Sequence, residues 1–227
     1  MSLVIAHRGV WGPGGPADNT LEAFEAAIEL GADMIELDVR RTRDGRLIVF
    51  HDARVKTVPI SSLRYAAIRI RGTKRNPPLL EEVLALTKDR IALNLEVKEA
   101  GCVEETIALL RPFGLERCLL SSFLDDVITE AKALAPELRT GLLLATGFRK
   151  ALTTRLPASN ADCLCLHHRV ATATALASAT EAGTTCVVWT VNAPKAMDRY
   201  LSHPAVEGMI TDRPALALER RTHLRAR

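Results

Sequence analysis

The sequence has little net charge and no long apolar run, and each absence narrows the possible classes of protein. Its 227 residues carry 30 Lys and Arg against 27 Asp and Glu, a formal net charge of +3. An imbalance this small argues against nucleic acid as the main partner. No apolar stretch approaches the roughly 20 residues that span a bilayer, so we expect no stable membrane insertion.

Cysteine is also scarce, and the chain opens without an evident targeting segment. Five cysteines, an odd number and widely scattered, favour reduced thiols and a cytoplasmic protein. Residues 1–6 lack the basic and apolar regions of a signal peptide. A soft-metal site is conceivable in Cys163-Leu-Cys165-Leu-His167-His168, but the alternation with apolar residues favours buried strand thiols instead.

Strand-like and helix-like runs alternate along the rest of the chain. The strand-like runs cover residues 3–6, 34–39, 91–97, 118–121, 140–145, 162–166, 186–191 and 208–211. Amphipathic segments cover 20–30, 79–88, 103–110, 125–134, 148–156, 172–182 and 193–201, and a final helical segment follows Pro214. This alternation predicts an α/β fold, a single-domain (β/α)8 TIM barrel. We expect the barrel to occupy residues 1–218.

Two local features of this barrel can be predicted. Asn19 is a plausible N-cap for the first helix, with Glu22 three residues later. The basic residues 219–227 are expected to form a frayed, solvated tail, with a weak contact to an anionic surface as the alternative. The sequence does not indicate an oligomeric state.

A hairpin is predicted to extend from the second strand. Asp44-Gly45 between β-rich runs is typical of a two-residue turn, which would pair Asp38 with His51. Glu36 and Asp38 share one strand face because side chains alternate. Two carboxylates beside an imidazole suit Mg²⁺ or Ca²⁺ and proton transfer. The alternative is a charged surface hairpin with a structural histidine.

Active sites of such barrels lie at the C-terminal ends of the strands, where polar residues recur in this sequence. These residues are His7, Arg8, Glu36, Asp38, Glu96, Lys98, Trp189, Thr190, Asn192, Thr211 and Asp212. Three carboxylates can supply the oxygen ligands of one divalent cation. The two cationic side chains suit a phosphate, and His7 with His51 suits acid/base catalysis. Alternatively, the cations only neutralise the carboxylates in a structural network, which does not explain two histidines as well.

Ordered motifs give the chain a resemblance to the glycerophosphodiester phosphodiesterase family, from Leu3 to about Leu218. They are His7-Arg8-Gly9, Asn19-Thr-Leu-Glu-Ala-Phe24, Gly31-Ala-Asp33, Glu36-Leu-Asp38-Val, Asp44-Gly45, His51-Asp52, Pro78-Leu-Leu-Glu-Glu-Val83, Leu95-Glu-Val-Lys98, Ser121-Ser-Phe123, Trp189-Thr-Val-Asn192 and Thr211-Asp-Arg-Pro214. No single block is decisive, but their order is very specific. Asn19 recurs in that family, although helix capping explains it here.

The resemblance implies a role for each matched residue. Glu36, Asp38 and Glu96 match the metal-binding carboxylates, His7 and His51 the acid/base pair, and Arg8 and Lys98 the phosphate-contacting residues. It implies hydrolysis of a small-molecule glycerophosphodiester to sn-glycerol 3-phosphate and an alcohol, with one divalent cation, Mg²⁺ or Ca²⁺. A lysophospholipase D acting on lysolipids and a non-catalytic phosphodiester-binding barrel are the other classes.

The chain departs from that family after the His-Asp motif. Family members commonly carry a longer lid insertion there, whereas only residues 53–77 intervene here, with an unusually basic Arg69–Arg75 segment. A shortened lid opens the mouth, which leaves the alcohol headgroup undetermined and makes a lipid-bearing diester conceivable. Trp189 is expected either to wall the substrate pocket or to be a buried barrel tryptophan.

Overall fold

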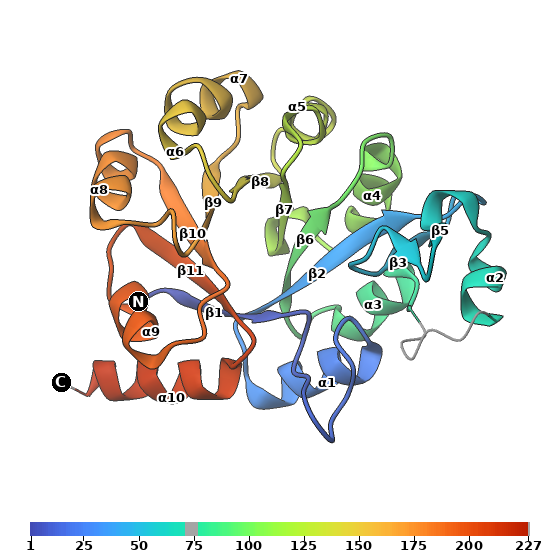
Figure 1. The fold of residues 1–227 in the computed structure, drawn as a ribbon, viewed down its shortest axis with the longest axis horizontal. Helices are drawn as coiled ribbons and strands as arrows, with labels where there is room; N and C mark the ends of the chain where they lie inside the picture. Colours follow the sequence, from blue (N-terminus) through green and yellow to red (C-terminus); the bar gives the residue numbers. More distant parts are fainter. Residues whose placement is uncertain (71–76, 227) are drawn as a thin grey trace.

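A computed structural model describes residues 1–70 and 77–226 and shows eight parallel strands closed into a barrel (Figure 1). The barrel strands are β1 (Leu3–His7), β2 (Met34–Arg41), β6 (Ala92–Val97), β7 (Cys118–Ser122), β8 (Arg139–Leu144), β9 (Cys163–His167), β10 (Thr185–Trp189) and β11 (Val206–Thr211). Strand β1 pairs in parallel with both β2 and β11, which closes the ring. The predicted single-domain (β/α)8 barrel is confirmed.

Helices surround the strands on the outside of this ring (Figure 1). They are α1 (Leu21–Leu30), α3 (Leu80–Thr87), α4 (Val103–Leu110), α5 (Asp125–Leu134), the sequence of turns α6, η3 and α7 (Phe148–Lys150, Ala151–Arg155 and Leu156–Ser159), α8 (Ala173–Glu181), α9 (Pro194–Leu201) and α10 (Pro214–Arg225), with a 3-10 turn η2 (Leu115–Arg117) before β7. Their apolar faces and the outward faces of the strands form the main core. None of the helices in the described ranges has the length and apolar character that a bilayer crossing needs.

A smaller apolar cluster fills the inside of the barrel. It consists of Ile5, Leu119, Leu143, Cys163, Cys165, Val187 and Ile210, with Met34 and Trp189 packed against it. Cys163 and Cys165 are therefore buried strand thiols, as predicted, and both are free. This cluster forms the floor below the C-terminal ends of the strands.

The hairpin after β2 has a different register from the predicted one. Strand β3 (Leu47–Val49) pairs with β2 so that Arg41 faces Leu47, and the Thr42 amide donates to the Arg46 carbonyl (2.9 Å). The loop therefore contains residues 43–45, with Gly45 at a φ of 77°. A shift of one residue changes every cross-strand pair.

Contacts within the loop and to residues beyond the hairpin favour this loop length. The Asp44 carboxylate accepts hydrogen bonds from the Thr42 hydroxyl (2.7 Å) and from the Tyr65 amide (3.0 Å), while the Arg43 amide donates to the Leu63 carbonyl (2.8 Å). The predicted pairing of Asp38 with His51 is consequently wrong. Phe50 lies opposite Asp38, because its amide donates to the Asp38 carbonyl (2.9 Å).

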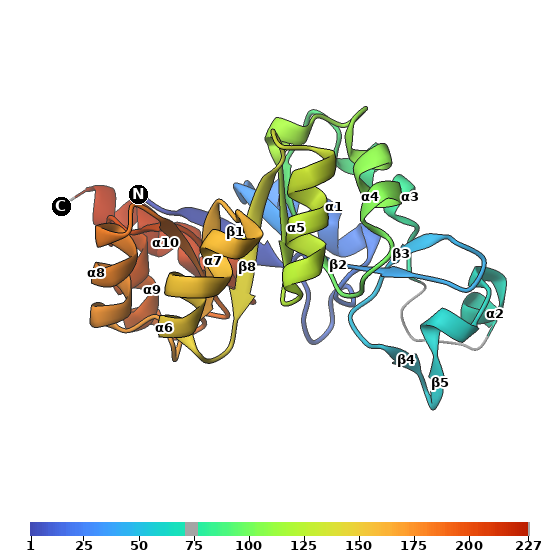
Figure 2. The same ribbon diagram turned by 90° about the horizontal axis from the view of Figure 1, so that it is seen from above.

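Residues 53–70 form a small unit beside the hairpin, which Figure 2 shows at one side of the barrel. Its described elements are β4 (Arg54–Val55), β5 (Val58–Pro59), a 3-10 turn η1 (Ile60–Ser62) and α2 (Tyr65–Ile70). A separate cluster of Ile48, Phe50, Val55, Ile60, Leu63, Ile68 and Leu79 holds this unit against the hairpin. The basic segment Arg69–Arg75 noted in the sequence lies largely outside the described residues.

Two predictions at the ends of helices are wrong. The N-cap of α1 is Thr20, whose side chain accepts from the Ala23 amide, and not Asn19. Residues after 218 do not form a frayed tail, because α10 continues to Arg225. Arg220 pairs with Asp198 and Arg221 with Asp33, so these basic side chains fasten α10 to the barrel.

The turn that leaves β1 depends on glycine. Gly9 has a φ of 88°, and a Cβ atom at this position would lie 2.6 Å from the Ala23 carbonyl oxygen on α1. Both the backbone conformation and the close approach to the helix therefore exclude a side chain. This turn fixes the direction of the preceding residues, His7 and Arg8.

We expect Gly9→Ala to lower the free energy of unfolding by about 2–4 kcal/mol, because it combines an unfavourable φ with a clash against backbone. Gly14→Ala is the matched control, since Gly14 has a φ of 79° but no atom within 4 Å of an added Cβ. It should cost only about 1 kcal/mol. Urea unfolding of both variants measures the difference, and equal losses would contradict the proposed clash.

Candidate active site

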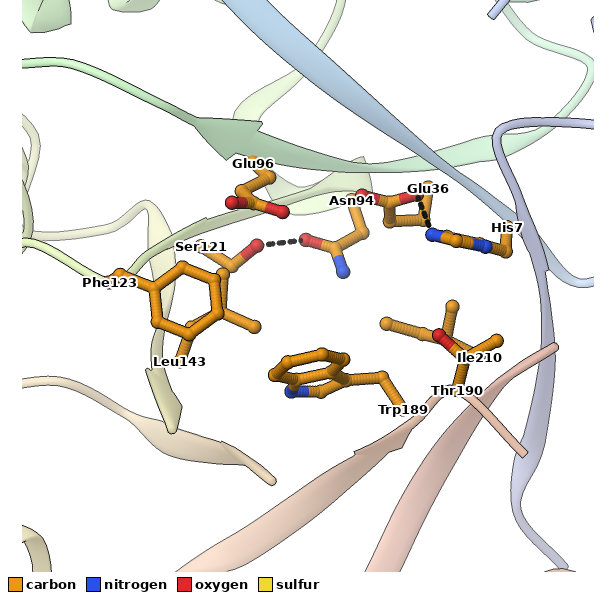
Figure 3. A pocket seen from close by; sticks show the side chains of 10 residues that line it. All are labelled: His7, Glu36, Asn94, Glu96, Ser121, Phe123, Leu143, Trp189, Thr190 and Ile210. Atoms are coloured by element: carbon orange, nitrogen blue, oxygen red, sulfur yellow. Dashed lines mark hydrogen bonds and ion pairs between the residues drawn. The ribbon is translucent and has the colours of Figure 1, made fainter. Parts of the chain in front are cut away.

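A pocket opens at the C-terminal ends of the barrel strands, where Figure 3 shows side chains from different strands converging. It is lined by His7, Glu36, Asn94, Glu96, Ser121, Phe123, Leu143, Trp189, Thr190 and Ile210, and with its mouth it has a volume of about 290 Å³. One side is polar and carries the carboxylates. The other side is formed by aromatic and aliphatic side chains.

Glu36, Asp38 and Glu96 form a buried carboxylate cluster, in which one oxygen of each residue lies within 4.8 Å of the others. The backbone explains this convergence. Glu36 and Asp38 are two residues apart on β2, and Asp38 faces Glu96 across the pairing of β2 with β6. Three carboxylates on one barrel face are therefore a direct result of strand register.

Cationic side chains neutralise part of this cluster. Lys98 Nζ lies 2.8 Å from Asp38 Oδ1 and 2.5 Å from Glu96 Oε1, and Arg8 Nε lies 3.0 Å from Asp38 Oδ2. Burial raises the pKa of Asp38, but the charges of Lys98 and Arg8 outweigh it and lower that pKa overall. The structural ion-pair network considered from the sequence therefore exists around Asp38.

Glu36 does not fit that interpretation. Within residues 1–70 and 77–226, no Lys or Arg lies within ion-pair distance of Glu36, and its buried Oε2 has no hydrogen-bond partner. Burial, followed by the charge of Asp38, raises the pKa of Glu36 to about 8. A hard divalent cation fits such a cluster of oxygen donors, because it would compensate the charge that the side chains leave unbalanced.

His7 is held at the edge of the pocket by residues from the last two strand ends. Its Nδ1 lies 2.5 Å from Asp212 Oδ1, which leaves Nε2 on the side of Glu36, 3.8 Å from Oε2. The Asn192 side chain donates to Asp212 (2.6 Å) and accepts from the Asp212 amide (3.0 Å). Burial lowers the pKa of His7, but the hydrogen bond to Asp212 and the charge of Glu36 raise it overall.

His51 lies farther out, and its side chain is 39% exposed. Its Nδ1 lies 3.0 Å from Asp52 Oδ1, and its carbonyl accepts from Arg40. It does not line the pocket, but its charge adds to the lowering of the Asp38 pKa and offsets a small part of the rise that burial causes in the pKa of Glu96. The two predicted histidines thus have different environments, one buried and one at the rim.

Asn19 belongs to the site, although its role in the sequence was interpreted as capping. Its Nδ2 donates to Asp38 Oδ2 (2.7 Å), the same oxygen that faces Arg8. Arg8 and Asn19 both have left-handed backbones, with φ of 59° and 58°, and the Asn19 amide donates to the Arg8 carbonyl (3.0 Å). Asparagine tolerates this conformation well, which is the sequence signal for such a position.

The aromatic side of the pocket is centred on Trp189. Its indole N–H donates to the Cys165 carbonyl (2.8 Å), and its ring packs edge-on against Phe123 and His167, with centroid distances of 5.6 and 4.9 Å. Trp189 therefore lines the pocket while remaining anchored to β9. Phe123 belongs to one of the sequence motifs, but only the folded structure shows that it forms a wall of the pocket.

Comparison with known proteins agrees with this arrangement. The glycerophosphoryl diester phosphodiesterase family matches residues 7–216. A glycerophosphodiester phosphodiesterase of Caldanaerobacter subterraneus subsp. tengcongensis is 31% identical over 94% of this chain and 95% of its own length. A lysophospholipase D of Rattus norvegicus is 31% identical, but over 51% of this chain and 43% of its own length.

Solved structures share the whole fold. A candidate glycerophosphoryl diester phosphodiesterase of Agrobacterium tumefaciens has a TM-score of 0.88 and 26% identity, with 100% of both chains covered. A phosphodiesterase of Oleispira antarctica, solved with the product sn-glycerol-3-phosphate, has a TM-score of 0.81 and 26% identity over 96% of each chain. The match over nearly the whole sequence shows that this chain belongs to the glycerophosphoryl diester phosphodiesterase family and is a phosphoric diester hydrolase.

Proposed function

We propose that this protein hydrolyses glycerophosphodiesters to sn-glycerol 3-phosphate and an alcohol, with one Mg²⁺ or Ca²⁺ held by Glu36, Asp38 and Glu96. The observation that carries the proposal is the buried Glu36 carboxylate. Its Oε2 has no hydrogen-bond partner, and two further carboxylates lie beside it. Such an arrangement is costly unless a cation compensates it. The family's relatives in the comparison support the substrate class.

The bound cation would neutralise a phosphoryl oxygen and stabilise the negative charge that builds during displacement. Lys98 and Arg8 both lie within ion-pair distance of Asp38, and both have a raised pKa. Burial lowers each pKa, but the neighbouring carboxylates outweigh burial, so both side chains stay charged. They would contact the remaining phosphate oxygens and fix the orientation of the diester.

His7 and His51 would perform the proton transfers. One histidine takes the proton of the nucleophile, which is either water or the neighbouring glycerol hydroxyl, and the other protonates the leaving alkoxide. Asp212 accepts the hydrogen bond of His7 Nδ1 and thereby keeps Nε2 directed to the pocket. His51 is at the solvent-accessible rim, where exchange of a proton with water is direct.

A second candidate function is a lysophospholipase D activity on lysolipids. The observation that favours it is an apolar rim next to the pocket, since Phe123 and Leu124 are 41% and 40% exposed. An acyl chain bound there would cover both side chains. We place this activity second because the lysophospholipase D relative matches only half of this chain.

Removing the Glu36 charge should stabilise the metal-free protein. In the folded protein the pKa of Glu36 is raised from 4.5 to about 8. Between these pH values the carboxyl is ionised in the unfolded chain but still protonated in the folded one, so the folded state loses stability as the pH rises. We expect Glu36→Gln, in EDTA, to increase the free energy of unfolding at pH 8 by on the order of 2 kcal/mol and less at pH 5.

Urea unfolding at both pH values measures this effect. Asp38→Asn is the matched control, because Lys98 and Arg8 lower the pKa of Asp38, so removing this charge should not stabilise the protein. In the wild type, Mg²⁺ or Ca²⁺ should raise the melting temperature, and this rise should be smaller in Glu36→Gln. A Glu36→Gln protein less stable than wild type in EDTA would contradict the unbalanced buried charge.

Replacement of either histidine should affect turnover more than folding. We expect His7→Ala and His51→Ala each to lower kcat by at least ~10²-fold, because each loses one proton transfer. Steady-state kinetics on glycerophosphocholine, with circular dichroism as the folding control, tests this. Near-wild-type turnover in either variant would remove that histidine from the mechanism.

The substrate assignment is tested with a panel of glycerophosphodiesters and lysolipids. We expect turnover of glycerophosphocholine to exceed that of lysophosphatidylcholine, to disappear with EDTA and to return with Mg²⁺ or Ca²⁺. Faster turnover of lysophosphatidylcholine would establish the second candidate function instead. Equal activity with and without chelator would refute the metal assignment.

A further inference from the structure

The pocket contains a fully buried side chain, Asn94, that the proposed mechanism does not use. Asn94 lies on β6, two residues before Glu96 and level with Glu36 in the strand pairing. Its Oδ1 accepts a hydrogen bond from the Ser121 hydroxyl (2.8 Å), while its Nδ2 has no partner. In Figure 3 this nitrogen points into the pocket, away from Ser121.

An amide nitrogen in this state is a donor held ready for a ligand. Buried side-chain donors are nearly always paired, because an unpaired one loses its hydrogen bonds to water. Ser121 is buried as well and fixes the amide through Oδ1, so the two N–H groups are presented to the pocket in one orientation. The pocket is therefore built to receive an acceptor oxygen at this point.

The surroundings of Asn94 indicate which oxygen that is. The positive side chains Arg8 and Lys98 lie around Asp38, toward the mouth, where a phosphate would be held. Asn94 is neutral and lies deeper, because it precedes Glu96 on a strand whose C-terminal end forms the mouth. The nearby wall is apolar, with Leu143, Trp189 and Ile210. A neutral donor beside an apolar wall suits a short polyol better than a second anionic group.

We propose that Asn94, held by Ser121, donates a hydrogen bond from Nδ2 to a hydroxyl oxygen of the glycerol part of the substrate. This inference rests on the proposed function and specifies how the substrate enters the site. The small constant part, glycerol, goes into the closed end of the pocket, and the variable alcohol extends from the mouth. Asn94 thereby discriminates between glycerol esters and esters of simple alkyl alcohols, because an alkyl ester leaves the amide unpaired.

The test compares two monoesters that differ only in their hydroxyl groups, sn-glycerol 3-phosphate and n-propyl phosphate. Their dissociation constants are measured by titration calorimetry on the full chain with saturating Mg²⁺. We expect the wild type to bind sn-glycerol 3-phosphate at least about tenfold more tightly, and Asn94→Ala to weaken that ligand about tenfold while changing n-propyl phosphate less than about twofold. Ser121→Ala should shift binding in the same selective way, to a smaller degree.

Thr184→Val is the matched control. Thr184 also has a buried hydroxyl without a partner, but it precedes β10 at the opposite end of the barrel, so neither ligand should bind differently. Equal weakening of both ligands in Asn94→Ala would assign the amide to the phosphate and overturn the proposal. Unchanged binding of both, or a wild type that does not discriminate, would overturn it as well.

Calorimetry keeps this inference separate from the proposed function. A wild type that prefers sn-glycerol 3-phosphate through Asn94 but does not hydrolyse any glycerophosphodiester would refute the function and support the glycerol contact. Hydrolysis without this preference would refute only the glycerol contact. If Asn94→Ala does not fold, Ser121→Ala decides the question, because it leaves the amide in place and removes only its support.

Discussion

The burial of three carboxylates at one end of the barrel is the constraint on which the rest of the site depends. Asp38 is fully buried, and three groups lie at its two oxygens: Lys98, Arg8 and Asn19. Without such partners a buried carboxylate gives up its charge. Arg8 and Asn19 both have left-handed backbones, and both bring a side-chain nitrogen to the same Asp38 oxygen, as an ion pair from Arg8 and a hydrogen bond from Asn19.

The negative charge of Glu36 is not neutralised by Lys98 or Arg8 in the way that the charge of Asp38 is. Lys98 and Arg8 lie within ion-pair distance of Asp38, and Lys98 also of Glu96, whereas among the described residues only the His7 imidazole lies within that distance of Glu36, at 3.8 Å. A fully neutralised cluster would be more stable and would bind a cation less well, because Lys and Arg would occupy the same oxygens. Stability and binding are therefore opposed at this residue, a relation common at functional sites. Asn94 is a similar case, because its buried side-chain nitrogen is a hydrogen-bond donor without a partner.

Barrel closure joins parts of the chain that are far apart in sequence. The contact between His7 and Asp212 spans 205 residues and exists because β1 pairs with β11. The same closure places the Trp189 wall opposite the carboxylates of β2 and β6 (Figure 3). α10 supports it from outside through the ion pairs of Arg220 and Arg221. One closed ring of parallel strands thus brings together the carboxylate cluster, the oriented His7 imidazole and the aromatic wall of the pocket.

The amino-acid sequence by itself determined the order of strands and helices, the barrel and the identity of the carboxylates, because hydrophobic periodicity and residue spacing are local properties. Only the tertiary structure decided the hairpin register, since Asp44 is held by the Tyr65 amide of the neighbouring unit. The tertiary structure likewise decided that the Asn19 side chain donates to Asp38 instead of capping α1, and that Asn94 faces the pocket. These outcomes depend on which distant groups compete for each polar atom, and spacing along the chain carries no information about that competition.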